Sequence, residues 1–173
     1  HWSDITGLPV NLVESADATW TSLRQAMLWA TLAIVFLLLA LWRRIGDTLI
    51  ALGPLLLAVL LTQVSTLVLP VAFTFANVMV LPLLLGIGID GGVHIVYRAH
   101  RHGESDLHSG ATTQAVWYSA LTTIASFGML VISAHRGVAS LGFLLVVGMI
   151  WVLAANLVLL PALLRLRAGR ASA

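Results

Sequence analysis

Long apolar runs separated by short polar segments make up most of the chain from residue 25 onward. An α-helix of roughly 20 apolar residues crosses the ~30 Å hydrocarbon core of a bilayer. Five runs have about this length, and we expect transmembrane helices at about 25–42, 48–69, 72–97, 112–134 and 138–164. Because the runs are continuous rather than amphipathic, the pattern predicts an all-α membrane protein with a five-helix transmembrane bundle.

The first part of the chain has a mixed pattern of polar and apolar residues. It predicts a short strand at Val10–Val13 followed by a helix at the membrane surface. We therefore expect residues 1–24 to be the end of an extramembrane domain with its connector, 25–167 the transmembrane bundle and 168–173 a tail. The chain begins with His1 and shows no signal peptide, so we expect it to be the end of a longer polypeptide.

The arginines predict the orientation of the bundle. With five spans, alternate connections lie on the same side of the membrane. One side then carries Arg43, Arg44, Arg98, Arg101, Arg165, Arg167 and Arg170, and the other carries Arg24 and Arg136. Since cytoplasmic segments are enriched in basic residues, we expect the C-terminus in the cytoplasm and the N-terminus outside.

The composition excludes several classes of protein. The chain is 60% hydrophobic and 9% charged, whereas a soluble domain has about 45–50% apolar and about 25% charged residues. The absence of cysteine excludes disulfides and thiolate metal sites. No basic run is flanked by aromatic residues, so we predict no nucleic-acid binding.

Two short patterns resemble cofactor or metal sites. The run Gly86-x-Gly88-x-x-Gly91 matches the dinucleotide fingerprint, but it lies inside a predicted span with no preceding strand. His100, His102 and His108 lie in a polar connection without cysteine, where hydration explains them. No catalytic triad or phosphate-binding loop is present, so we expect neither an enzyme nor a bound metal or cofactor.

Asp90 is the only carboxylate inside a predicted span. It lies about 12 Å along a helix from Arg98, well within the hydrocarbon. A charged side chain at that depth costs at least ~2.5–3.5 kcal/mol, so it faces a partner or water and is a candidate functional residue. Such a carboxyl group can carry a proton, because the bilayer disfavours its charged form.

Residues of the same span surround Asp90 at helical spacing. Gly86 and His94 lie four residues to either side, on the same face of the helix. We expect Gly86, Gly88 and Gly91 to allow close helix packing, and His94 to pass a proton toward the cytoplasmic end. The alternative is a structural hydrogen bond between Asp90 and His94 that only fixes helix packing.

The following span carries a stripe of hydroxyl groups, formed by Ser119, Thr122, Thr123 and Ser126. A hydroxyl can donate a hydrogen bond to a neighbouring helix, so Thr122, Thr123 and Ser126 are candidate partners of Asp90 in a proton relay. The alternative is that these hydroxyls serve helix packing alone. For Asn156, within the last span, we predict a hydrogen bond between helices.

The run from Gly86 to Asp90, with Val93-His94-Ile95 and Tyr97-Arg98 after it, resembles the tenth transmembrane helix of RND-superfamily exporters. The nearest branch is the MMPL-like one, and within it the hopanoid-biosynthesis-associated transporters. Residues 120–128 and the final helix, with Pro161 before its arginines, are similar to helices eleven and twelve. In the MMPL pattern a tyrosine usually follows the aspartate, where this chain has Gly91.

The resemblance implies a twelve-helix pump in the bacterial inner membrane, driven by protons and carrying periplasmic domains. This chain would be its C-terminal part, residues 1–24 would end a periplasmic domain, and Asp90 would be the proton-relay carboxylate. The implied partners are a hydrophobic, hopanoid-like lipid, protons, the membrane and the rest of the same polypeptide. The sequence leaves open whether the assembly is a homo-oligomer.

Two alternatives remain at this point. A SecD/SecF-like protein-export motor also carries glycine and aspartate in the equivalent helix, although His94 and Tyr97 fit it less well. A sterol-sensing-like or purely structural bundle would use Asp90 for packing only. Replacing Asp90 with asparagine keeps the shape and removes the proton site, so transport by this variant distinguishes a relay from a packing role.

Overall fold

The computed structural model describes residues 8–69, 75–102 and 111–171. Every regular element in these ranges is a helix, which confirms the all-α fold class. The helices are α1 (Leu8–Trp42), α2 (Ile45–Val68), α3 (Phe75–His102), α4 (Ala111–Val131), α5 (Arg136–Ala154), the π-helical segment η2 (Ala155–Leu159) and α6 (Leu160–Ala171).

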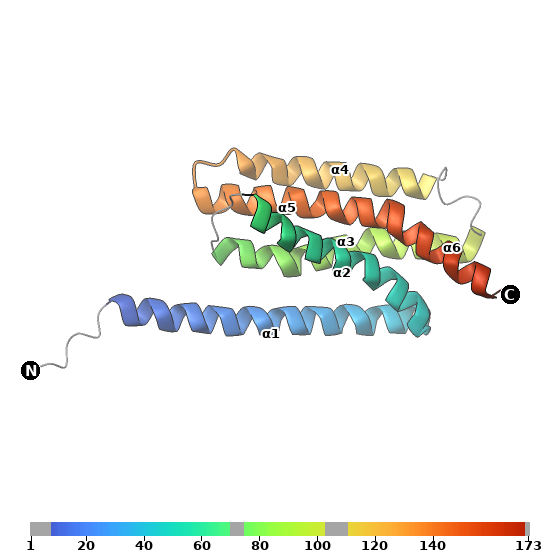
Figure 1. Cartoon of the computed structure of the whole chain (residues 1–173), viewed down its shortest axis with the longest axis horizontal. Helices are drawn as coiled ribbons and strands as arrows, with labels where there is room; N and C mark the ends of the chain where they lie inside the picture. Colours follow the sequence, from blue (N-terminus) through green and yellow to red (C-terminus); the bar gives the residue numbers. More distant parts are fainter. Residues whose placement is uncertain (1–7, 70–74, 103–110, 172–173) are drawn as a thin grey trace, which may run out of the picture.

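Successive helices run alternately in opposite directions along the long axis of the molecule (Figure 1). The helix α5 continues through η2 into α6, so the last three elements form one long rod. The C-terminal ends of α1, α3 and α6 lie at the same end of the bundle, opposite the start of α1. A tight turn joins α1 to α2, where Arg43 has a φ of 51°.

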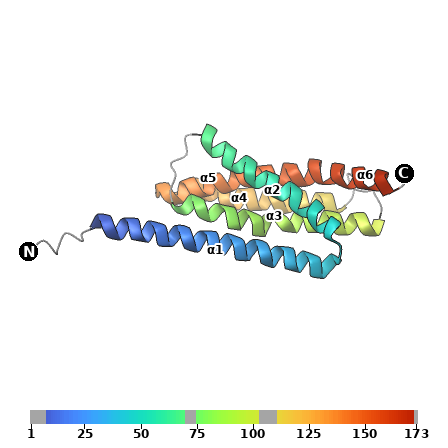
Figure 2. The ribbon, with the colours of Figure 1, turned by 60° about the horizontal axis from the view of Figure 1, so that its bottom comes forward.

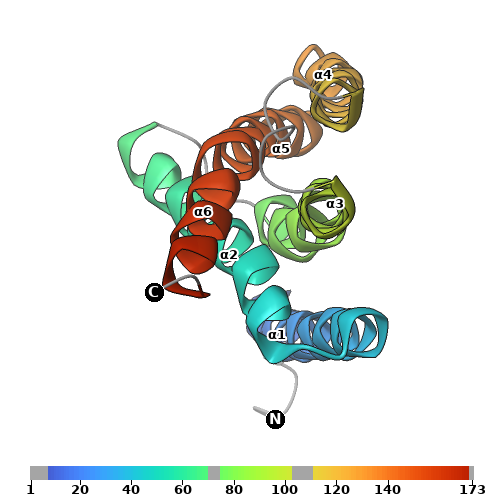
Figure 3. The same cartoon turned by 90° about the vertical axis from the view of Figure 1, so that its right-hand side faces the viewer.

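The helices α2, α3 and α5 form the middle of the bundle, and α1 and α4 lie at its edges. Figure 2 shows α2 crossing the α5–α6 rod at a tilt, and Figure 3 shows α1 beside α2 and α3. The helix α4 lies on the far side, packed mainly along α5. Much of the surface of α1 and α4 therefore has no helical neighbour among the described residues.

Four stretches are long and apolar enough to cross a membrane, namely Arg24–Trp42, Ile45–Val68, Met79–Ala99 and Arg136–Arg167. The helix α4 has 21 residues, but Gln114 and several hydroxyl residues lower its hydropathy and it does not belong to this set. Its bounds match the fourth predicted span closely. The chain is a multi-pass membrane protein, and the fifth crossing stays a prediction.

The strand expected at Val10–Val13 is wrong, because these residues lie within α1. This helix continues without a break from Leu8 through Trp42, across the boundary that we predicted at residues 24–25. No neighbouring strand is available within the described ranges, so a short alternating pattern has no sheet to join. A helix satisfies its backbone groups internally and needs no such partner.

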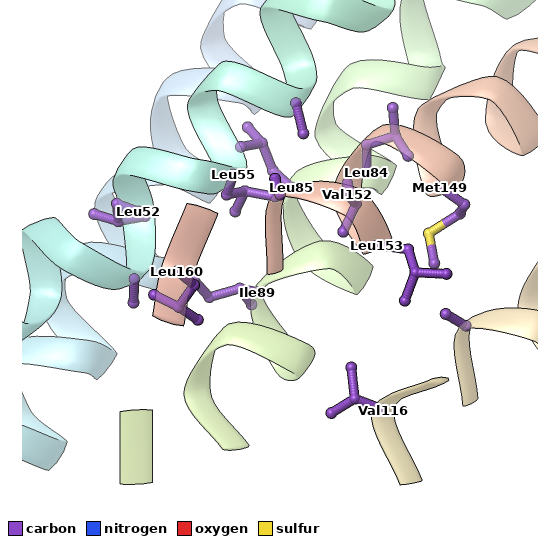
Figure 4. Packing of buried hydrophobic residues seen from close by; sticks show 14 of the residues in the cluster. Leu52, Leu55, Leu84, Leu85, Ile89, Val116, Met149, Val152, Leu153 and Leu160 are labelled. Atoms are coloured by element: carbon purple, nitrogen blue, oxygen red, sulfur yellow. The ribbon is translucent and has the colours of Figure 1, made fainter. Parts of the chain in front are cut away.

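The packed interior lies where α2, α3 and α5 meet (Figure 4). Its labelled members are Leu52, Leu55, Leu84, Leu85, Ile89, Val116, Met149, Val152, Leu153 and Leu160. Glycines bring the helices close together, as small residues do in membrane proteins. A Cβ added at Gly88 would lie 2.5 Å from Cδ1 of Leu55. The outer surface is also apolar, with Phe36 and Leu67 strongly exposed, as lipid contact requires.

Side-chain hydrogen bonds also link neighbouring helices. The indole Nε1 of Trp151 in α5 donates to Oγ of Ser65 in α2, at 2.9 Å. The amide Nδ2 of Asn156 in η2 donates to the carbonyl oxygen of Gly88 in α3, at 3.3 Å. The second bond confirms the helix–helix role that the sequence predicts for Asn156.

Candidate functional site

A cavity of about 580 Å³ lies between α3, α4 and the α5–η2 rod. Its polar lining consists of Asp90 and His94 from α3, Ser119 and Thr123 from α4, and Asn156 from η2. The remaining lining residues are small or apolar. The fold therefore brings polar side chains from three helical elements into one space inside an otherwise apolar bundle.

Asp90 lies near the middle of α3 and is exposed, whereas Gly88 and Ile89 just before it and Gly92 just after it are buried. One face of α3 thus packs into the bundle, and Asp90 is on the side that opens into the cavity. His94, one helical turn further along, is exposed as well. The acid is enclosed on one side only by the helices described here.

No hydrogen bond joins Asp90 to His94 within the described part of the chain. The structure therefore gives no support to the alternative in which this pair fixes helix packing. Both side chains line the same cavity on the same face of α3, as their spacing predicts. This arrangement leaves the carboxylate and the imidazole free to meet water, a proton or another part of the protein.

The three glycines that we expected to serve helix packing lie in different surroundings. A Cβ at Gly88 would meet Leu55 and Val152, and a Cβ at Gly91 would lie 2.8 Å from Nδ2 of Asn156. A Cβ at Gly86 would meet nothing within 4 Å. Close packing in the described bundle thus depends on Gly88 and Gly91, and Gly86 faces open space there.

The hydroxyl groups of α4 donate to the backbone of their own helix. Thr122 Oγ1 donates to the Tyr118 carbonyl at 2.8 Å, Thr123 Oγ1 to the Ser119 carbonyl at 2.9 Å, and Ser126 Oγ to the Thr122 carbonyl at 2.8 Å. Thr123 lines the cavity with Asp90, whereas Thr122 and Ser126 do not. The hydroxyl oxygens can still accept hydrogen bonds, but their protons are not directed at Asp90.

One ionic contact was not predicted from the sequence. Asp47, near the start of α2, is 2% exposed and forms an ion pair with Arg167 of α6, which is 42% exposed. A Cβ at Gly46 would lie 3.1 Å from Nη2 of Arg167, so the guanidinium lies close to the backbone of α2 at this glycine. The only signal in the sequence is that both residues fall on the same predicted side of the membrane.

The described residues contain no group of three or more histidine, cysteine, aspartate or glutamate side chains that could hold a metal ion. Of the histidines in the polar connection, His108 lies outside the described residues. His100 and His102 end α3, but the surroundings of their side chains are not described. The candidate site therefore consists of Asp90 and the polar groups around its cavity.

Comparison with known proteins assigns the chain to a family. The model of the MMPL family matches residues 3–173. The chain is 42% identical over 159 residues to the hopanoid transporter HpnN of Rhodopseudomonas palustris (strain TIE-1), covering 92% of the chain and 18% of that protein. It is 37% identical over 158 residues to the hopanoid transporter HpnN of Burkholderia multivorans (strain ATCC 17616 / 249), covering 91% and 18%. The chain thus spans less than a fifth of the length of these relatives.

Proposed function

This chain belongs to the MMPL family of membrane transporters, and we propose that it is the C-terminal membrane part of a proton-driven exporter of a hydrophobic, hopanoid-like lipid. The names of the two relatives support this class of substrate. They do not favour a protein-export motor of the SecD/SecF type or a bundle without transport. The chain itself supplies a site for the driving ion, and the rest of the polypeptide completes the pump.

The observation that carries the proposal is the position of Asp90. It is a carboxyl group near the middle of a membrane-spanning helix, and it lines a polar cavity instead of packing into the core. A charged group at this depth in a membrane costs free energy, so carboxylates in such places usually have a function. In our proposal Asp90 takes up a proton from one side of the membrane and releases it to the other.

His94 extends this path by one helical turn, toward the end of α3 where Arg98 lies. The imidazole suits a relay, because its unperturbed pKa is the closest of all side chains to neutral pH. Thr123 and Ser119 line the same cavity, and their oxygens can accept hydrogen bonds from a protonated Asp90 or from water. Thr122 and Ser126 do not line the cavity, so we give them no part in this path.

The energy available from the proton is sufficient for a conformational step. One elementary charge that crosses a potential of 100 mV releases about 2.3 kcal/mol. Protonation also removes the charge of Asp90, so the helix can pack against a less polar surface. Proton transfer could therefore switch α3 between two packing arrangements that differ by a few kcal/mol in free energy.

The exposed side of α3 and α4 indicates where the rest of the polypeptide packs. Asp90, His94 and the outward residues of α4 are exposed in the described part of the chain, although they lie within apolar elements. We propose that helices of the missing part cover this side and close the cavity. They would supply further polar groups for the proton path.

The proposed location is the bacterial inner membrane. The ends of α1, α3 and α6 lie together at one end of the bundle, and the connections there carry most of the arginines. The positive-inside rule then places this end in the cytoplasm and the start of α1 in the periplasm. Residues 1–24 would lead from a periplasmic domain into the membrane, with α1 as the continuous connector.

The test uses the full-length transporter in proteoliposomes with an imposed proton gradient and a radiolabelled hopanoid. Asp90→Asn keeps the size of the side chain and removes the proton site, so we expect gradient-driven export to fall to the level of empty liposomes. Gly53→Ala is the matched control, since it lies on α2 outside the cavity and a Cβ there would meet nothing within 4 Å. Export by D90N at the parental rate would rule out the relay.

A further inference from the structure

The rod formed by α5 and α6 contains one π-helical segment, and that segment lies next to Asp90. In η2 the N–H of Leu160 donates to the carbonyl of Ala155, five residues back. A π-helical turn inserts one extra residue and rotates the residues that follow around the helix axis, and such turns occur frequently at functional sites. Asn156, the second residue of η2, is 3% exposed and points its amide at α3.

The amide of Asn156 rests on three glycines of α3, Gly88, Gly91 and Gly92, which we call the glycine seat. Nδ2 donates to the Gly88 carbonyl at 3.3 Å. A Cβ at Gly91 would lie 2.8 Å from Nδ2, and a Cβ at Gly92 would lie 3.5 Å from Oδ1. A side chain at position 91 would therefore displace the amide, whereas a Cβ at position 92 would make an ordinary contact with it.

The glycines of the seat flank Asp90 in the sequence. Gly88 lies two residues before it, and Gly91 and Gly92 lie one and two residues after it. Residues two apart in an α-helix differ by about 200° around the axis, so the face that carries Gly88 and Gly92 points almost opposite to Asp90. Fixing this face on Asn156 fixes the direction in which Asp90 projects.

We propose that Asn156 is the positioning residue of the proton carrier. It holds α3 in the rotation that turns Asp90 into the cavity, and it links any movement of Asp90's helix to the α5–α6 rod. The hydrogen bond also gives a buried amide a partner, without which its burial would be costly. This inference rests on the proposed function, since a positioning role matters only where Asp90 carries the proton.

The experiment compares variants of the full-length transporter in proteoliposomes, with rates expressed per amount of folded protein. Asn156→Leu keeps much of the volume and removes the donor, and Gly91→Ala places a methyl group against the amide. A misplacement of about 1 Å at a reacting group can lower a rate by about a hundredfold. We therefore expect N156L and G91A to lower the maximal export rate about tenfold or more, while the lipid concentration for half-maximal rate stays unchanged. Gly53→Ala, on α2 outside the cavity and with nothing within 4 Å, should export at the parental rate.

A double-mutant comparison separates positioning from a general loss of stability. Asn156→Ala also removes the donor, so N156A should export about as slowly as N156L. With the amide gone, the methyl group of G91A has nothing to displace, so the double variant G91A/N156A should export at the rate of N156A alone. N156L with parental export, in a transporter that D90N inactivates, would overturn the positioning role and leave the proposed function standing. A double variant whose loss of rate is the product of the losses of G91A and N156A would overturn the role of the seat, and this comparison does not depend on recovering folded N156L. Parental export by D90N would remove the proposed function and this inference together.

Discussion

Removing either partner of the ion pair between Asp47 and Arg167 should destabilise the chain, but by different amounts. Asp47 is 2% exposed and Arg167 42% exposed. Loss of Arg167 therefore leaves a buried charge, whereas loss of Asp47 leaves a partly hydrated one. Arg167→Ala removes the cation beside a buried carboxylate, and removing one partner of a buried pair costs about 3–5 kcal/mol. Asp47→Ala leaves a guanidinium that is already partly hydrated, and the loss is then nearer ~1 kcal/mol.

The assay is thermal unfolding of the 173-residue chain in detergent micelles. One kcal/mol shifts the Tm of a chain of this size by about 2–4 °C. We expect the lower figure of about 3 kcal/mol for R167A, because Arg167 is not fully buried, and so a Tm about 6–12 °C below that of the parent. D47A should lower the Tm by about 2–4 °C.

Two further variants complete this test. The double variant D47A/R167A removes the buried charge together with its partner, so its Tm should equal or exceed that of R167A. Arg165→Ala removes an exposed arginine of the same helix and should change the stability by less than about 0.5 kcal/mol. Equal losses in D47A and R167A, or a double variant whose loss is the sum of both, would refute the assignment of Asp47 as the buried member of the pair.

Three further predictions concern packing and hydrogen bonds. Gly88→Ala forces a methyl group against a leucine of α2 and should cost about 1–3 kcal/mol of stability, whereas Gly86→Ala should leave the Tm unchanged. Trp151→Phe removes the donor to Ser65 and should cost about 1 kcal/mol; an unchanged Tm would argue against that bond. Thr122→Val removes a hydroxyl that donates to its own helix, so export of labelled hopanoid should stay within about twofold of the parental rate, since such bonds contribute little to a helix. A loss as large as that of D90N would contradict this.

Much of the fold could be predicted from the sequence because membrane-spanning helices are specified by length and composition. The predicted span 112–134 corresponds to α4 (Ala111–Val131), and the span 138–164 falls within the rod from Arg136 to Ala171. The short strand at Val10–Val13 could not be judged correctly, because a pattern of four residues is compatible with a strand or a helix. A strand also needs a neighbouring strand to pair with, and these four residues alone do not show whether one is present.

The candidate site was only partly accessible to sequence reasoning. The spacing of Asp90 and His94 predicts their common face, and both line the cavity. The direction of the hydroxyl of Thr122 is not encoded by spacing, since a carbonyl one turn back is always within reach of a threonine in a helix. The pair of Asp47 and Arg167 joins residues 120 positions apart, and only the packed bundle brings them together.

The role of Asn156 depends on a local irregularity. A hydrogen bond between helices is what a buried amide in a membrane span requires, and the sequence alone predicts that much. The π-helical turn that directs Asn156 to Gly88 has no recognisable sequence signal, because it arises where the packing of the rod favours one additional residue. The link between Asn156 and Asp90 therefore became visible only in three dimensions.

The central claim is that Asp90 carries the proton, and proton uptake tests it most directly. Full-length transporter is reconstituted with a pH-sensitive dye inside the liposomes, and hopanoid is added under an imposed proton gradient. We predict lipid-dependent acidification with the parental protein and with Gly53→Ala, and none above the level of empty liposomes with Asp90→Asn. Lipid-dependent acidification by D90N at the parental rate would show that Asp90 does not carry the proton.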